Sequence, residues 1–281
     1  MTTGFDHQKI SALLREVGQT CILPFWKQLT EGQIRQKTSP TDIVTEADLL
    51  AERILSRRLR DLLPCSLVLG EEGYAENSQI ISIFKDENPV WIIDPIDGTL
   101  QFTRGQHDFG TMVALVQAGE ILAGWVYHPA TDDLLMVENG SGAYFNDARL
   151  SMLPSLSLTE MYGILGMDIL PDLPRIRQHS NAPSFDNDNY VCCAATIALL
   201  TDVPFHGRTT GAQHHFRAVA KHCMPWDDAA NALAVRESGG EVINWAGHKY
   251  QPDMMGGGVI SAPTYADCLA LRDWLDQACD S

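Results

Sequence analysis

Two aspartates follow an apolar run in the segment WIIDPIDGT, residues 91–99. The run predicts a strand that ends at Asp94 and aims Asp94 and Asp97 into one cleft. Gly98 and Thr99 then offer backbone N–H groups where the chain turns helical, an arrangement that binds phosphate. Hydrolysis of a phosphate monoester combines such donors with Mg²⁺, which prefers carboxylate oxygens. A plain Asx turn is the alternative.

Two earlier segments also carry carboxylates that could enter the same cleft. Glu71 and Glu72 in GEEGY follow a strand-like run directly, although paired glutamates are usually just solvated. Asp48 in DIVTEAD lies in line with the apolar row of a predicted helix. A capping box at the start of that helix, with Thr45, would explain Asp48 equally well. The two roles of Asp48 are compatible.

A later segment, PWDDAANALAVRESGG at 225–240, predicts an Ala-rich helix that two glycines stop. Asp227 at its start would be held firmly enough to point at a metal ion, beside the rigid wall of Trp226. The simpler interpretation makes Asp227 only the N-cap of the helix.

Hydrophobic periodicity predicts the elements that would position these side chains. Residues 1–150 form an α+β half with most of the metal ligands, and residues 151–281 form a more α/β-like half with Asp227 and the substrate-specificity segment. The first half contains two amphipathic helices and a close succession of short strands, which favours antiparallel pairing. The predicted helices are 5–29, 45–63, 226–238 and 264–278, and the predicted strands are 66–70, 90–94, 111–117, 121–129 and 134–140.

The composition limits the classes of partner. The chain has 281 residues and a formal net charge of −16, which argues against direct contact with nucleic acid or an anionic membrane surface. Its seven cysteines form no CxxC pair, which argues against a zinc site or a disulfide framework. No apolar stretch approaches the roughly 20 residues of a membrane span, and the expected location is the cytoplasm.

The four segments, in the order SPTDIVTEAD, GEEGY, WIIDPIDGT and PWDDA, resemble the inositol monophosphatase family over most of residues 37–240. The superfamily also contains fructose bisphosphatases, bisphosphate nucleotidases and histidinol phosphatases. The resemblance implies an α/β (α+β) fold, the layered αβαβα sandwich of the inositol monophosphatase and fructose bisphosphatase type. It further implies a homodimer, inhibition by lithium, and Mg²⁺-dependent hydrolysis of a small phosphorylated metabolite.

The resemblance also implies ligands for two to three Mg²⁺ ions. The first ion would be held by Glu71, Asp94 and the carbonyl of Ile96. The second would be held by Asp94, Asp97 and Asp227, and a weaker third by Glu71 with waters.

The remaining roles implied by the resemblance concern phosphate and proton transfer. Gly98 and Thr99 would bind the phosphate. Asp48, with the Thr99 hydroxyl, would orient the attacking water and help to deprotonate it, and Glu71 would assist as a catalytic residue. Glu72 and Lys37 match positions that support these groups.

The chain departs from the family pattern in its second half. Where typical members have Gly-Ser/Thr-Ala-Ala, this chain has Cys192, Cys193 and two alanines, so that a thiol replaces a hydroxyl expected near the substrate alcohol. The stretch before Trp226 is longer than expected and lacks an acidic residue found in the inositol enzymes. Asn231 stands where a glycine is frequent. Recognition of a polyol is therefore open, and we interpret the cysteines as small buried hydrophobes.

The segment 203–224 is rich in histidine and also basic. It could form a pocket for a second phosphate or carboxylate of the substrate, or be a solvated loop without a role. Cys193 and Lys221 are candidate specificity residues.

The substrates that stay open are inositol phosphate or a similar sugar-type monoester, histidinol phosphate, fructose bisphosphate and 3′,5′-bisphosphate nucleotides. A regulatory or binding protein that retains the fold is the alternative of another class. The histidines and basic residues of segment 203–224 are His206, Arg208, His214, His215, Arg217, Lys221 and His222.

Overall fold

The chain forms two large β-sheets, a two-stranded ribbon and seven labelled helices within the residues that the computed structural model describes, which are 4–37, 42–166, 168–169, 172–176, 183–186, 193–195, 200–201, 214–221 and 223–280. The helices are α1 (His7–Val17), α2 (Glu46–Leu62), α3 (Glu71–Glu76), α4 (Thr99–Thr103), α5 (Leu173–Ile176), α7 (Pro225–Glu237) and α8 (Tyr265–Asp280).

The first sheet contains seven strands in the order of the chain, and its neighbours are antiparallel except for the parallel pair β3 and β4. The expected antiparallel succession is thus confirmed from β4 onward. A small ribbon of β1 (Ile34–Gln36) and β2 (Ile43–Thr45) precedes the sheet. The strands are β3 (Leu67–Gly70), β4 (Val90–Asp97), β5 (Gly110–Gln117), β6 (Glu120–His128), β7 (Asp133–Glu138), β8 (Gly142–Phe145) and β9 (Ala148–Arg149).

The second sheet is mixed and has the strand order β11-β10-β12-β14-β13. β10 pairs in parallel with β11 and β12, whereas β14 is antiparallel to β12 and β13. Its strands are β10 (Tyr162–Leu165), β11 (Ser184–Asp186), β12 (Phe216–Val219), β13 (Glu241–Asn244) and β14 (Val259–Ala262).

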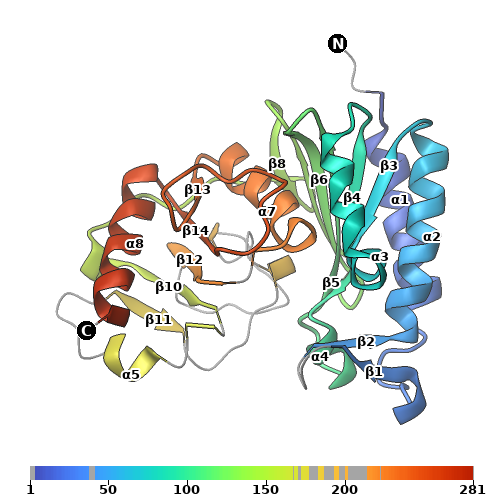
Figure 1. Ribbon diagram of the computed structural model, residues 1–281, viewed down its shortest axis with the longest axis horizontal. Coiled ribbons are helices and arrows are strands. Elements are labelled where there is room, and N and C mark those ends of the chain that lie inside the picture. Colours follow the sequence, from blue (N-terminus) through green and yellow to red (C-terminus); the bar gives the residue numbers. More distant parts are fainter. Residues whose placement is uncertain are drawn as a thin grey trace.

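Five layers follow one another across the molecule (Figure 1). From right to left in the view, they are α1 with α2, the first sheet, α7, the second sheet, and α8. Three clusters of buried apolar side chains fill the spaces between these layers. The expected αβαβα sandwich is therefore confirmed.

Helix α1 is shorter than the sequence predicted. Asp6 caps it by accepting hydrogen bonds from the backbone N–H groups of Gln8 and Lys9. The α-helix ends at Val17 and continues only as a π-helical turn, Gly18–Ile22. The predicted extension to residue 29 is wrong, because Pro24 lacks the N–H that would continue the helical hydrogen bonds. The second predicted helix, by contrast, matches α2 within one residue at each end.

Helix α7 lies between the two sheets and is buried on nearly all sides. Four of its ten buried residues are alanines, whose small side chains allow close packing on both sides. Gly124 of β6 lets α7 approach the first sheet closely, because a Cβ atom at this position would lie 3.0 Å from the Cα of Ala230. The helix can therefore bring its first turn against the end of β4.

Strand β4 does not end at Asp94, as predicted, but continues to Asp97 through a bulge. Asp94 pairs with Met112 and Asp97 with Gly110, so two residues of β4 stand opposite Thr111 alone. Pro95, which has no N–H for the ladder, is one of the two. Residues three apart in a regular strand point to opposite faces, and the extra residue lets Asp94 and Asp97 reach the same face.

The division of the chain near residue 150 stays a prediction. The first sheet ends with β9 and the second begins with β10, which is the position where the sequence pattern changes. However, α7 belongs to the second half and packs on the first sheet. No described helix has the length and apolar character that crossing a membrane requires.

Candidate active site

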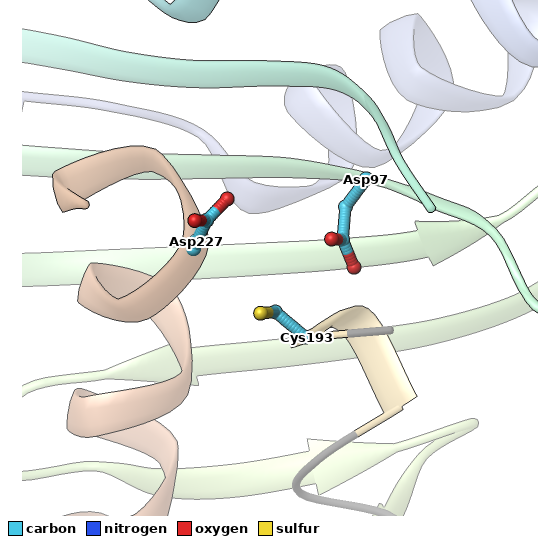
Figure 2. A group of neighbouring side chains, drawn as sticks. All are labelled: Asp97, Cys193 and Asp227. Atoms are coloured by element: carbon cyan, nitrogen blue, oxygen red, sulfur yellow. The ribbon is translucent and has the colours of Figure 1, made fainter. Parts of the chain in front are cut away.

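Three aspartates converge where the bulge of β4 meets the first turn of α7. The carboxyl groups of Asp94 and Asp227 lie close enough to interact directly. Figure 2 shows Asp97, Asp227 and Cys193 around one space, and one ligand atom from each lies within 4.8 Å of the others. The interpretation of Asp227 as an N-cap is wrong, because Met224 is the N-cap and Pro225 follows it at the first helical position. Asp227 is thus free for another role.

Electrostatic repulsion dominates this group of carboxyls. Burial raises the pKa of Asp94 well above its ordinary value, and Glu71, Asp97 and Asp227 raise it further. Burial likewise raises the pKa of Asp227, with Asp97 as the largest charged contributor. Burying like charges together is unfavourable unless protons or cations neutralise them.

A cation fits this arrangement. Asp94 is 2% exposed, and its Oδ1 has no hydrogen-bond partner in the part of the chain that the structure describes. Buried carboxylate oxygens normally have partners. A hard oxygen donor without such a partner, beside the carboxylates of Asp97 and Asp227, suits Mg²⁺.

Lysine 37 ties together the two glutamates of the GEEGY segment. Its Nζ lies 2.8 Å from Glu71 Oε1 and 2.7 Å from Glu72 Oε1. Burial lowers the pKa of Lys37, but Glu71 and Glu72 more than offset this and raise it. Burial and the charge of Glu71 raise the pKa of Glu72 to about 8. Lys37 therefore fixes both carboxyls and supplies positive charge beside the aspartates.

Glutamate 52 is a contributor that the sequence analysis missed. Its carboxylate accepts the backbone N–H groups of Glu72 and Gly73, both at 2.8 Å, and so caps the start of α3. A Cβ atom on Gly70 would collide with this carboxylate. The spacing in the sequence could have indicated Glu52, since it lies four residues after Asp48 on the same face of α2.

Asp48 and Thr99 lie next to each other, as the resemblance implied. Thr45 donates to Asp48 Oδ2 from its N–H at 2.8 Å and from its hydroxyl at 2.5 Å, so the predicted capping box is present as well. The Thr99 hydroxyl lies 3.4 Å from Asp48 Oδ1 and 2.9 Å from the carbonyl oxygen of Ile96. Burial raises the pKa of Asp48 to about 7, against the opposing effect of Thr45.

Glycine 98 separates β4 from the short helix α4. Its φ of 82° lies in the left-handed region, where residues with a Cβ are disfavoured. The left-handed turn lets Thr99 begin α4 directly after the strand. The predicted change from strand to helix at these two residues is confirmed.

A 3₁₀ turn, Cys193–Ala195, closes the other side of the site. The backbone N–H of Ala194 donates to Asp97 Oδ2 at 2.5 Å. Asn231 of α7 donates to the carbonyl oxygen of Cys193 at 2.7 Å and to that of Asp227 at 3.1 Å. The sequence showed only that Asn231 stands where a glycine is frequent, because its partners are distant in the chain.

The thiol of Cys193 is not simply one more apolar group. Arg217 donates to Cys193 Sγ at 3.0 Å and to Asp228 Oδ1 at 3.0 Å. Burial raises the pKa of the thiol well above its usual range, and Asp97 and Asp227 raise it further against the opposing effect of Arg217. By contrast, Cys223 is buried and fits the predicted role of a small hydrophobe.

The basic segment before α7 is only partly within the described residues. His214, His215 and Arg217 are buried, so the interpretation as a solvated loop is wrong for these three. Arg217 is paired with Asp228 rather than free for a substrate anion. Lys221 is exposed, and its backbone N–H donates to Asp168 at 2.5 Å. Cys192, His206, Arg208 and His222 lie outside the described residues.

Solved structures share this fold over nearly the whole chain. An IMPase of Thermotoga maritima matches with a TM-score of 0.74 and 27% identity and covers 97% of each chain. An extragenic suppressor protein from Bartonella henselae matches with a TM-score of 0.75 and 24% identity, over 96% of this chain and 98% of that one. The layered fold and the carboxylate site, with this likeness, define a phosphatase, a hydrolase of phosphoric monoesters.

The sequence comparisons specify the family. The sequence model of the inositol monophosphatase family matches residues 8–273, and the chain belongs to this family. It is 32% identical over 238 residues to a fructose-1,6-bisphosphatase/inositol-1-monophosphatase of Thermotoga maritima, which covers 84% of this chain and 83% of that protein. It is 30% identical over 223 residues to the Nus factor SuhB of Vibrio cholerae, over 76% of each.

Proposed function

We propose that this protein is a Mg²⁺-dependent phosphomonoesterase that acts on an inositol phosphate or a similar sugar-type monoester. The convergence of Asp94, Asp97 and Asp227, with an unpartnered buried oxygen on Asp94, carries the proposal. One solved relative of the fold is an IMPase/NADP phosphatase complexed with Mg²⁺ and phosphate, and another is bound to inositol monophosphate.

Two to three Mg²⁺ ions would be held by Glu71, Asp94, the Ile96 carbonyl, Asp97 and Asp227. When bound, Mg²⁺ would neutralise phosphoryl oxygens and lower the pKa of the attacking water. Lys37 and Glu52 hold the neighbouring glutamates in place through the contacts described above. The burial of the aspartates keeps their electrostatic interactions strong.

Asp48 and Thr99 would take part in proton transfer from the attacking water. With a pKa of about 7, Asp48 can accept a proton near neutral pH. The Thr99 hydroxyl lies between Asp48 and the Ile96 carbonyl and can donate to one of them while it accepts from a water. The N–H groups of Gly98 and Thr99 would bind the phosphate.

The substrate panel that tests this function contains inositol phosphates, histidinol phosphate, fructose bisphosphate, adenosine 3′,5′-bisphosphate and glycerol 2-phosphate. Phosphate release is measured for each with Mg²⁺ and with EDTA. We expect metal-dependent release, with preference for an inositol or other sugar-type monoester. Equal release in EDTA would contradict the metal assignment, and preference for the nucleotide or histidinol phosphate would replace the proposed substrate.

A regulatory role is the second candidate, because one relative carries the name of a Nus factor. The presence of all the proposed catalytic carboxylates favours the enzyme, since a protein that had abandoned catalysis would have no need to keep them. Absence of phosphate release from the whole panel, in a folded protein that binds Mg²⁺, would favour the regulatory function.

The proposal extends to properties that the family resemblance implies. We expect a homodimer, measurable by light scattering after gel filtration, and loss of activity on addition of lithium salts. The cytoplasmic location, the two-part organisation with a boundary near residue 150, and specificity roles for Cys193 and Lys221 are part of the same proposal.

A further inference from the structure

A sulfur atom lies within the group of oxygen donors at the active site. The ligand atoms of Asp97, Cys193 and Asp227 all lie within 4.8 Å of one another. They come from the end of β4, from the 3₁₀ turn and from the first turn of α7. Asp97 and Cys193 are also linked through the backbone, because the N–H of Ala194 donates to the Asp97 carboxylate.

We propose that Asp97, Cys193 and Asp227 form a binding site for a thiophilic divalent cation, with Zn²⁺ and Cd²⁺ as the class of ligand. Thiolate ligands select such ions over Mg²⁺, which binds through oxygen alone. Tetrahedral Zn²⁺, with ligand distances of about 2.0–2.3 Å, places its donor atoms roughly 3.5 Å apart. The three side chains need only a small closing movement to reach that geometry.

A second observation at the site concerns Asp94, a candidate for the fourth ligand. Asp94 is 2% exposed, and its Oδ1 has no hydrogen-bond partner among the described residues. Its carboxyl group interacts directly with that of Asp227, so it adjoins the proposed site. One thiolate and three carboxylates would complete the four-coordinate shell that Zn²⁺ favours.

The arginine beside Cys193 fixes the position of the sulfur atom. The Nη2 atom of Arg217 lies 3.0 Å from Cys193 Sγ, and its Nη1 lies 3.0 Å from Asp228 Oδ1. Asp228 therefore holds the guanidinium in place, and the guanidinium holds the sulfur. Groups that orient a metal ligand in this way contribute to metal affinity. On binding, the metal–sulfur bond replaces the S–H bond, and the proton passes to the buffer.

The proposed site shares Asp94, Asp97 and Asp227 with the Mg²⁺ site proposed above, so the two kinds of cation exclude each other. Nitrogen and sulfur donors raise affinity for Zn²⁺ far more than for Mg²⁺. A thiophilic ion would therefore displace Mg²⁺ and inhibit the enzyme. Cation binding can be measured without substrate, so the inference can fail or succeed separately from the phosphatase function.

The test titrates metal-free protein with Cd²⁺ and follows thiolate-to-metal charge-transfer absorption in the ultraviolet. We expect this absorption in the unaltered protein and its loss in Cys193→Ser, which removes the soft donor at nearly constant size. Zn²⁺ affinity, measured by competition with a chelating dye, should fall by about 100-fold in Cys193→Ser. The exposed Cys65 provides the matched control, because Cys65→Ser should retain both signals.

Competition with Mg²⁺ shows whether Cd²⁺ binds at the proposed site. Excess Mg²⁺ should raise the Cd²⁺ concentration needed for half-saturation, and Asp227→Asn should weaken Cd²⁺ binding while it keeps every cysteine. Circular dichroism confirms that each variant is folded, and Asp227→Asn serves alone if Cys193→Ser does not fold. Full absorption in folded Cys193→Ser, unchanged Cd²⁺ affinity in Asp227→Asn, or no effect of Mg²⁺ would each overturn the proposal.

Discussion

The backbone N–H of Ala194 donates a hydrogen bond to Asp97 Oδ2 at 2.5 Å. The bond joins the 3₁₀ turn of the second half to the end of β4 in the first half. Asn231 extends the connection, because its amide donates to the carbonyl oxygens of Cys193 and Asp227. The relative positions of Asp97 and Asp227 therefore depend on one amide side chain and one turn.

Asn231→Ala should weaken Mg²⁺ binding. The Cys193 turn and the first turn of α7 lose their common donor, so Asp97 and Asp227 are no longer held at a fixed separation. We expect the Mg²⁺ concentration for half-maximal activity to rise by about 10–100-fold, with most of the activity recovered at saturating Mg²⁺. Mg²⁺ titrations of phosphate release measure both quantities.

The matched control for Asn231 is Asn88→Ala, because the described contacts of the Asn88 side chain are confined to Asp86. It should leave the Mg²⁺ dependence unchanged. An Asn231→Ala enzyme whose kcat falls equally at every Mg²⁺ concentration would show that Asn231 acts on the reaction rather than on the metal site.

Asp97→Asn should reduce phosphatase activity by several orders of magnitude while the protein still folds. The amide removes one negative ligand from the proposed Mg²⁺ site. It also relieves the repulsion that raises the pKa values of Asp94 and Asp227. Metal-free Asp97→Asn should accordingly unfold at a higher temperature than the unaltered metal-free protein.

The control for Asp97 is Asp61→Asn, which changes an exposed carboxylate on α2. Differential scanning calorimetry with and without Mg²⁺, beside phosphate release, separates stability from catalysis. Undiminished turnover in Asp97→Asn would show that the site is assigned to the wrong residues.

Local patterns in the sequence predicted the parts of the fold that depend on local interactions. The apolar spacing along residues 45–63 predicted α2, and Thr45 with Asp48 predicted its capping box, because both signals lie within single turns of one helix. The αβαβα layering came only from the family resemblance. Short apolar runs show that strands exist but not which sheet they join.

The features that the sequence did not predict depend on contacts between distant segments. The bulge at Pro95 exists only against β5. Asn231 and Arg217 have their partners in the Cys193 turn and at Asp228, so their types gave no sign of their contacts. Glu52 resembled an ordinary solvated helix residue. In each case the role follows from tertiary packing rather than from propensity.

Glu52→Ala should disturb the position of Glu71 and Glu72. The substitution leaves two N–H groups at the start of α3 without their acceptor, which costs about 1–2 kcal/mol of stability. We expect a raised Mg²⁺ requirement together with a lower unfolding temperature. Glu52→Gln retains one acceptor oxygen and should have a smaller effect, which gives a graded series.

Two further variants check the explanation for Glu52. Glu76→Ala, at the exposed end of the same helix, should change neither property. Gly70→Ala introduces a Cβ that collides with the Glu52 carboxylate, so it should reproduce the Glu52→Ala effect. If Gly70→Ala behaves like the unaltered protein, Glu52 does not act through its contact with α3.

The stability of the metal-free protein should fall as the pH rises through the neutral range. Burial raises the pKa of Asp48 from 3.8 to about 7 and that of Glu72 from 4.5 to about 8. Near pH 7 the unfolded chain has already released these protons while the folded protein still holds part of them. Raising the pH therefore favours the unfolded state until both folded groups are ionised.

Histidine 128 acts in the opposite direction but at lower pH. Its burial lowers its pKa from 6.5 to about 4, so protonation of the unfolded chain destabilises the fold only as the pH falls below 6.5. Measurements above that value avoid the histidine and report on buried carboxyls with raised pKa values, Asp48 and Glu72 among them. We expect a loss of about 1–3 kcal/mol, or several degrees in the unfolding temperature, between pH 6.5 and about pH 8.5.

Bound Mg²⁺ favours the ionised carboxylates, so the gain in unfolding temperature on adding Mg²⁺ should be larger at pH 8.5 than at pH 6.5. Calorimetric scans at both pH values, with EDTA and with saturating Mg²⁺, measure the four temperatures needed. Asp48→Asn removes one of the titrating groups and should flatten the pH dependence of the metal-free protein. A metal-free protein that becomes more stable as the pH rises over this range would mean that Asp48 and Glu72 are already ionised in the fold.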